Sequence, residues 1–175
     1  MATAPTRVQY VTPAVGYGST ASPKVTPTFD VVDGDVLTVI GSTEDSAATL
    51  ATPVGSGGSI TWTLLQSVNV SNYCTMYAWQ GDVGATATGI TLSVTRSGTA
   101  LAWSFGATLW RDHGGIGTSA KANASSGAPS LGVACSANSA LVVGCDDWNA
   151  VNGASRTWRT VNGSAITESL YFRNS

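Results

Sequence analysis

The chain's one histidine, His113, directly follows Asp112, and this pair is the first candidate for acid–base chemistry. A Ser-His-Asp hydrolase also needs a nucleophilic serine on a strained turn, usually within Gly-x-Ser-x-Gly, and the sequence has no such motif. Adjacent residues of a strand point to opposite faces, so the two side chains would not face each other there. We therefore interpret the pair as a polar cluster that closes a strand before the turn at Gly114.

Two pairs of aspartates are candidates for cation binding. Asp146 and Asp147 follow an apolar stretch, whereas Asp33 and Asp35 flank Gly34. Neither pair has the Asp-x-Asp-x-Asp-Gly loop and distant Glu that calcium-binding EF-hands use. For Asp33 and Asp35 we expect a turn with local side-chain hydrogen bonds. For Asp146 and Asp147 a structural role is favoured, with calcium as the alternative. The sequence predicts no cofactor, no catalytic residue and no enzyme.

Six tryptophans stand out in a chain of 175 residues. Trp62, Trp79 and Trp103 lie in alternating apolar runs, so we expect them in the core. The other three have charged neighbours, and Trp and Arg are both enriched at protein interfaces. We therefore predict an interface role for them, with stacking on a sugar as the alternative. The interface candidates from this group are Trp110, Arg111, Trp148, Arg156 and Trp158.

Strands must position these residues, because alternation of apolar and polar residues dominates the sequence. The runs are rich in Val, Ile, Thr, Trp and Tyr, and Gly or Asn occupies the turns between them. About ten short strands at a spacing of roughly 8 to 12 residues indicate an all-β fold, an antiparallel β-sandwich or jelly roll. The predicted strands cover residues 7–11, 36–42, 60–70, 74–80, 90–96, 100–110, 131–135, 140–145, 155–161 and 166–172.

Residues 1–28 differ from the rest of the chain because prolines interrupt them repeatedly. Proline cannot donate to a central ladder, so this segment is predicted to be an extended N-terminal arm with an edge strand. Residues 29–175 are then a single β-sandwich domain. We expect the arm to lie along a neighbouring subunit, because its apolar residues would otherwise be exposed. These interface candidates are Val8, Tyr10, Val11, Val15 and Tyr17.

Charged residues are scarce, at 10% of the chain compared with about 25% in an ordinary soluble domain. The net charge of −2 argues against nucleic-acid binding, which requires a basic surface. No run approaches the roughly 20 apolar residues that span a bilayer, and the first residues lack the apolar segment of a secretory signal. Three cysteines without a Cys-x-x-Cys motif fit neither a disulfide framework nor a zinc site.

Several segments between about residues 29 and 172 resemble small β-sandwich virion proteins of tailed bacteriophages that infect actinobacteria. The likeness begins with an Asp-Gly-Asp turn before an apolar strand and continues through tryptophan-bearing strands to a Trp-Arg-x-His-Gly turn. The segments are Asp33-Gly34-Asp35, Ile60-Thr61-Trp62-Thr63, Met76-Tyr77-Ala78-Trp79, Trp110-Arg111-Asp112-His113-Gly114, Asp147-Trp148-Asn149-Ala150 and Arg156-Thr157-Trp158.

The resemblance implies a structural role in a virion and no catalytic residues. The expected function is a capsid decoration or minor capsid protein that binds and stabilises the assembled head. Its partners would be the major capsid protein lattice and copies of itself, and its place the outer surface of the particle after synthesis in the host cytoplasm. One alternative is a minor tail protein or tail-fibre module that attaches to host glycans. A second alternative is a bacterial carbohydrate-binding surface domain.

Overall fold

The computed structural model is an all-β sandwich of antiparallel sheets, as the alternating sequence predicts. No helix occurs among the residues that the structure describes. These residues are 4–98, 101–124, 131–147, 160–161, 164–165 and 170–173.

The larger layer is a five-stranded antiparallel sheet with the strand order β1-β12-β4-β8-β7. Its central strands are buried on both faces, and β1 and β7 form its two edges. The strands are β1 (Thr6–Val11), β4 (Val36–Thr43), β7 (Ile60–Val70), β8 (Cys74–Val83) and β12 (Trp103–Arg111).

The second layer consists of short strands that pair around one continuous stretch of chain, residues 87–97. This stretch has strands β2 and β3 on one side and β5 and β6 on the other. The bounds are β2 (Lys24–Val25), β3 (Phe29–Val31), β5 (Thr49–Leu50), β6 (Val54–Gly55), β9 (Ala87–Ile90), β10 (Leu92–Val94) and β11 (Arg96–Ser97). The predicted strand at residues 90–96 is therefore split among three elements.

The hydrophobic core lies between the two layers, where alternate residues of each strand point inward. Trp79 and Trp103, both predicted core residues, are 2% and 0% exposed, and Trp62 packs against the core from the β7 edge. The buried cluster is Val11, Phe29, Val31, Leu37, Val39, Leu50, Trp79, Val83, Ile90, Leu92, Val94, Trp103, Phe105, Ala107 and Leu109.

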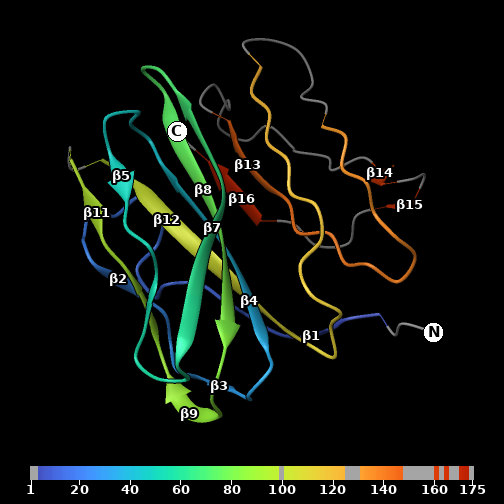
Figure 1. Ribbon diagram of the computed structural model, residues 1–175. Helices are drawn as coiled ribbons and strands as arrows, with labels where there is room; N and C mark the ends of the chain where they lie inside the picture. Colours follow the sequence, from blue (N-terminus) through green and yellow to red (C-terminus); the bar gives the residue numbers. More distant parts are fainter. Residues whose placement is uncertain are drawn as a thin grey trace.

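Residues 113–124 and 131–143 run without strands beside the face of the larger sheet that points away from the second layer (Figure 1). The Gln66 amide donates to the Ser119 hydroxyl at 2.9 Å, and the Lys121 amine donates to the carbonyl of Ser67. Further along, Gly144 lies against Ile40. The predicted strand at residues 131–135 is wrong, and the one at 140–145 starts only at Gly144. A segment that lies on the face of a sheet can alternate apolar and polar residues as a strand does, although its backbone does not pair with a neighbouring strand.

The last four elements are short, and only their backbones are described beyond Asp146. Strand β13 (Gly144–Asp147) pairs in parallel with β16 (Leu170–Arg173), and β14 (Thr160–Val161) pairs with β15 (Ser164–Ala165).

The segment predicted as an extended N-terminal arm with an edge strand (residues 1–28) contributes strands to both layers of the sandwich in its described part, residues 4–28. The predicted edge strand exists, because β1 pairs with β12 at the edge of the larger sheet. The chain then crosses to the second layer, where β2 pairs with β10. Val11 is 7% exposed and belongs to the core, so the interface prediction for this residue is wrong. Pro13 and Pro23 lie on the crossing between the layers, after β1 and directly before β2.

Lys24 fastens this segment to the larger sheet. It is 1% exposed, and its amine donates to the carbonyls of Gly16, at 2.8 Å, and Trp103. The same amine lies 5.0 Å from the centre of the Trp103 ring, a favourable position for a cation. Burial lowers the pKa of Lys24 to about 8, with the charge of Arg96 as the second cause, so the amine is mostly protonated at neutral pH.

We predict that Lys24→Met lowers the free energy of unfolding by about 1–3 kcal/mol, because the buried carbonyl of Trp103 loses a hydrogen-bond donor. Lys121→Met is the matched control, since Lys121 is exposed and also donates to a main-chain carbonyl. Urea unfolding at pH 7 measures both variants. Equal losses in the two variants would contradict the role assigned to Lys24.

Candidate interface at the base of the sandwich

The base of the sandwich, the lower end in Figure 1, is organised by the tight turn at residues 33–35. Gly34 has a φ of 85°, a conformation that glycine adopts without strain. The Asp35 main-chain N–H donates to the Val32 carbonyl at 3.0 Å, and the Val32 N–H donates to the Asp35 carboxylate at 2.8 Å. The predicted turn with local side-chain hydrogen bonds is therefore present. It places Asp35 at the start of β4.

Asp35 forms a two-pronged ion pair with Arg111, the last residue of β12. The Nε and Nη2 atoms of Arg111 donate to the two carboxylate oxygens, each at 2.7 Å. The Asp35 side chain is 1% exposed, whereas that of Arg111 is 38% exposed. Burial alone would raise the pKa of Asp35, but the bonds from Arg111 and from the Val32 N–H outweigh it and hold this pKa below its usual value. The pair joins the ends of two neighbouring strands.

Asp112 and His113 bind different partners at the same end of the molecule. The Thr6 hydroxyl donates to the Asp112 carboxylate at 3.4 Å. The His113 ring accepts from the Gly115 N–H at Nδ1, 3.0 Å away, so its Nε2 is the donor to the Gly34 carbonyl at 2.9 Å. Both ring nitrogens thus bind the main chain, which fits the interpretation of this segment as a polar cluster that closes β12.

A hollow of about 480 Å³ opens beside this cluster, between the edge strand β1 and strand β3. The ladder register of β1 shifts between Arg7 and Gln9, which leaves Val8 as the bulged residue. Val8 and Val32, on opposite sides of the hollow, are each 41% exposed. The hollow is lined by Val8, Gln9, Thr28, Phe29, Asp30, Val32 and Arg111.

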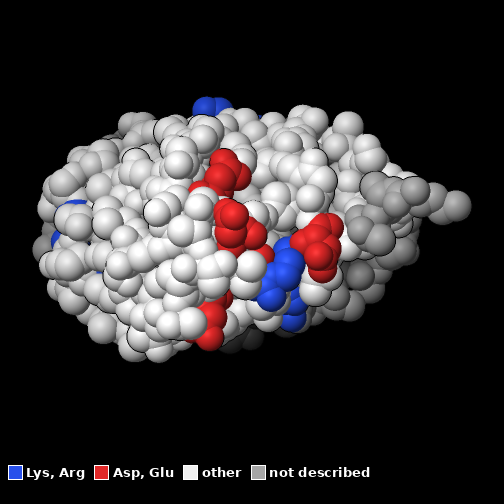
Figure 2. Space-filling model, turned by 60° about the horizontal axis from the view of Figure 1, so that its bottom comes forward, with Lys and Arg blue, Asp and Glu red and all other residues white. Residues whose placement is uncertain are grey.

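Exposed apolar side chains continue along the N-terminal segment beyond the hollow. Tyr10 on β1 is 42% exposed, and Val15 is 44% exposed. We use the name β1 surface for Val8, Tyr10, Val15 and Val32 together. Figure 2 shows that acidic and basic side chains also gather at the base of the molecule, with a few basic side chains at the edges of an otherwise uncharged surface. The β1 surface is therefore a set of exposed apolar side chains on the N-terminal segment and the neighbouring turn, of which Val8 and Val32 line the hollow together with the ion-paired Arg111.

The remaining interface candidates lie elsewhere or outside the described residues. Trp110 is half-buried on the outward face of the larger sheet. Its indole N–H donates to the Thr38 hydroxyl at 3.0 Å. Tyr17 is half-buried, and burial, with the charge of Asp146 as the second cause, raises its pKa. Among the residues outside the description are Trp148, Arg156 and Trp158.

The aspartates proposed as calcium ligands lie on β13. The Ser42 hydroxyl donates to the Asp146 carboxylate, and the side chain of Asp147 is outside the description. Within the described part of the chain, no group of three or more His, Cys, Asp and Glu residues is placed to hold a metal ion. Calcium binding stays a prediction. The described residues also contain no helix with the length and apolar character to cross a membrane.

The base of this all-β sandwich thus combines an internal ion pair with a hollow that exposed apolar side chains line. No known protein family matches the sequence. No curated protein and no solved structure matches it either.

We predict that Asp35→Asn makes the protein less stable at neutral pH and makes its stability less sensitive to acid. A carboxyl whose pKa is lowered by folding stabilises the folded state above its unfolded pKa of about 3.9, and this contribution is lost as the pH falls through the lower folded value. Urea unfolding between pH 7 and pH 2 measures the difference between the two proteins. Parallel pH profiles would show that the ion pair adds nothing to stability. Asp33→Asn is the control from the same turn.

Proposed function

We propose that this chain is a non-enzymatic structural protein of a bacteriophage virion, a capsid decoration or minor capsid protein that binds and stabilises the assembled head. The observation that carries the proposal is the β1 surface, with four apolar side chains between 41% and 44% exposed on a chain with only 10% charged residues. Two of these side chains, Val8 and Val32, line the hollow beside β1, and apolar side chains exposed at a hollow are typical of a contact site, because leaving them in water is unfavourable.

The scarcity of charge supports a role within an assembly. A neutral surface can be covered by a neighbour without taking ions out of water, which costs several kcal/mol per ion that stays unpaired. The buried carboxylate of Asp35 at the base adds no unpaired ion to such a contact, because Arg111 already neutralises it.

Stabilisation of the head follows from mass action. A protein that binds the assembled lattice, and not its separated subunits, shifts the equilibrium towards assembly by an amount that grows with its concentration. The partners proposed are the major capsid protein lattice and further copies of this chain, on the outer surface of the particle. No bond-making step is needed, which agrees with the binding of both His113 ring nitrogens to the main chain.

We predict that Val8→Glu weakens binding to heads at least about tenfold, because a charge would be buried at the contact. Val25→Glu is the matched control, since Val25 is also 41% exposed but lies on β2, away from the β1 surface. The measurement is co-sedimentation of each variant with purified heads that lack this protein, after thermal unfolding has shown that both variants fold.

Imaging of intact particles decides between the head and other locations. Regular density for this chain on the outer capsid surface is the expected result. Density only on the tail, or equal binding of the two glutamate variants to heads, would overturn the proposal. Tail density together with glycan binding would instead identify a host-attachment module.

A further inference from the structure

The second edge of the larger sheet, strand β7, is the longest strand in the described structure, with 11 residues. No Asp, Glu, Lys, Arg or His occurs anywhere in residues 54–70, which include β6 and β7. Exposed edge strands offer unpaired N–H and C=O groups to other chains, and proteins commonly block them with charged side chains. This edge carries no such block of its own.

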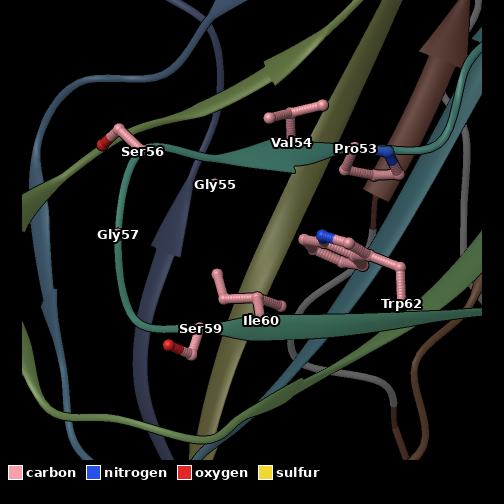
Figure 3. A pocket seen from close by; sticks show the side chains of 8 residues that line it. All are labelled: Pro53, Val54, Gly55, Ser56, Gly57, Ser59, Ile60 and Trp62. Carbon is pink, nitrogen blue, oxygen red and sulfur yellow. The ribbon is translucent and has the colours of Figure 1, made fainter.

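Among the described residues, the contacts from residues 119–121 fall on the second half of β7. The Gln66 side chain binds Ser119, and the Lys121 amine binds the Ser67 carbonyl, so residues 119–121 lie along that half. A register shift between Leu64 and Gln66 separates the two halves. The first half, residues 60–64, borders a hollow of about 300 Å³ between β6 and β7 (Figure 3). We call residues 60–64 the open edge.

The open edge is apolar as well as uncharged. Val54 is 65% exposed and Leu64 is 53% exposed, the two highest values among the large apolar side chains that the structure describes. Ile60 and Trp62 point from β7 towards β6, and Val54 points away from this space (Figure 3). The Trp62 ring lies so close to Gly81 that a Cβ atom there would be 2.6 Å from the ring, so a residue without a side chain is needed at this position of β8.

We propose that the open edge pairs with the same edge of a second copy of this chain. The two strands would run antiparallel about a twofold axis centred within residues 61–63, and the two five-stranded sheets would become one continuous sheet. The contact is isologous, so the strand must be complementary to itself. A strand of hydroxyl and apolar residues meets this condition, because like charges never face each other when it is paired with its own copy.

A second copy fits this edge better than a charged partner segment. An acidic strand would bring carboxylates near Asp82, which faces Thr61 from β8, and neither an acidic nor a basic strand would meet a charged side chain within residues 54–70 themselves. A copy of the chain brings the same neutral side chains and adds its own Leu64 to the apolar contact. This inference deepens the proposed function, which already expects contacts between copies, by naming the surface that makes them.

We predict that the full-length protein dimerises in sedimentation velocity experiments at concentrations up to about 0.1 mM, and that Leu64→Glu weakens the dimer at least about tenfold. The matched control is Leu131→Glu, because Leu131 is 49% exposed and lies on the irregular segment away from β7. Thermal unfolding must first show that both variants fold. A monomer throughout this concentration range would overturn the inference.

Single cysteines test the pairing itself. In an antiparallel pair about a twofold axis normal to the sheet, one residue lies opposite its own copy. In a Cys135→Ser background, Thr63→Cys alone forms a disulfide dimer if the axis passes residue 63, and Thr61→Cys alone if it passes residue 61. Only the double variant does so if the axis passes residue 62. Burial raises the pKa of the native Cys74 thiol to about 12, which keeps it unreactive, and the Cys135→Ser parent is the control.

The outcomes separate this inference from the proposed function. A dimer that Leu64→Glu leaves intact, or that none of the three cysteine variants traps, uses another surface and would falsify the inference. A monomeric Leu64→Glu variant that still binds heads supports both statements. A dimer trapped through residues 61–63 that binds no heads supports the pairing and removes the proposed function.

Discussion

The attachment of Trp103 to the N-terminal segment is the constraint on which the sandwich depends. Its main-chain N–H donates to the Tyr17 carbonyl at 3.2 Å, and its indole N–H donates to the Ala21 carbonyl at 2.9 Å. The Lys24 amine binds its carbonyl and lies over its ring. Trp103 is fully buried at the start of β12, a strand between β1 and β4. The polar groups of Trp103 thus bind residues 17–24, and its backbone pairs with Thr43 on β4. The two layers are therefore held together by a proline-rich segment that the sequence predicts to be an extended arm.

The same contacts explain why so little charge remains on the surface. Lys24 and Arg96 are 1% and 9% exposed, and both donate to main-chain carbonyls, with Arg96 reaching Gly98 and Thr20. The buried carboxylate of Asp35 is paired with the guanidinium of Arg111. The chain has eight Lys and Arg residues, so each one that is buried lowers the number of cations on the surface. The burial of Lys24, Arg96 and Asp35 therefore lowers the surface charge further in a chain whose sequence already contains only 18 charged residues, 8 Lys and Arg plus 10 Asp and Glu.

The sequence predicts the paired strands well and the contacts between them poorly. Strands β4, β7 and β12 follow the predicted ranges closely because a strand with one buried face needs apolar residues at alternate positions. No sequence rule indicates that Lys24 is buried, because lysine is normally exposed and its carbonyl partners exist only in the folded chain. The Asp35–Arg111 pair depends on the register of β4 against β12, in which Val36 faces Trp110. A register of this kind has no local signal in either strand.

The strand order leaves the two edge strands of the larger sheet, β1 and β7, available for different contacts. If copies pair through β7, the order β1-β12-β4-β8-β7 continues in reverse into the partner, and the two β1 edges lie at the far ends of the joined sheet. The β1 surfaces are then directed away from the twofold axis and are free for other contacts. A dimer of this form meets a lattice at two points, and the second contact is made at the high effective concentration set by the first. A rigid sheet fixes the spacing of the two contacts, so such a dimer would select neighbouring lattice sites at one distance.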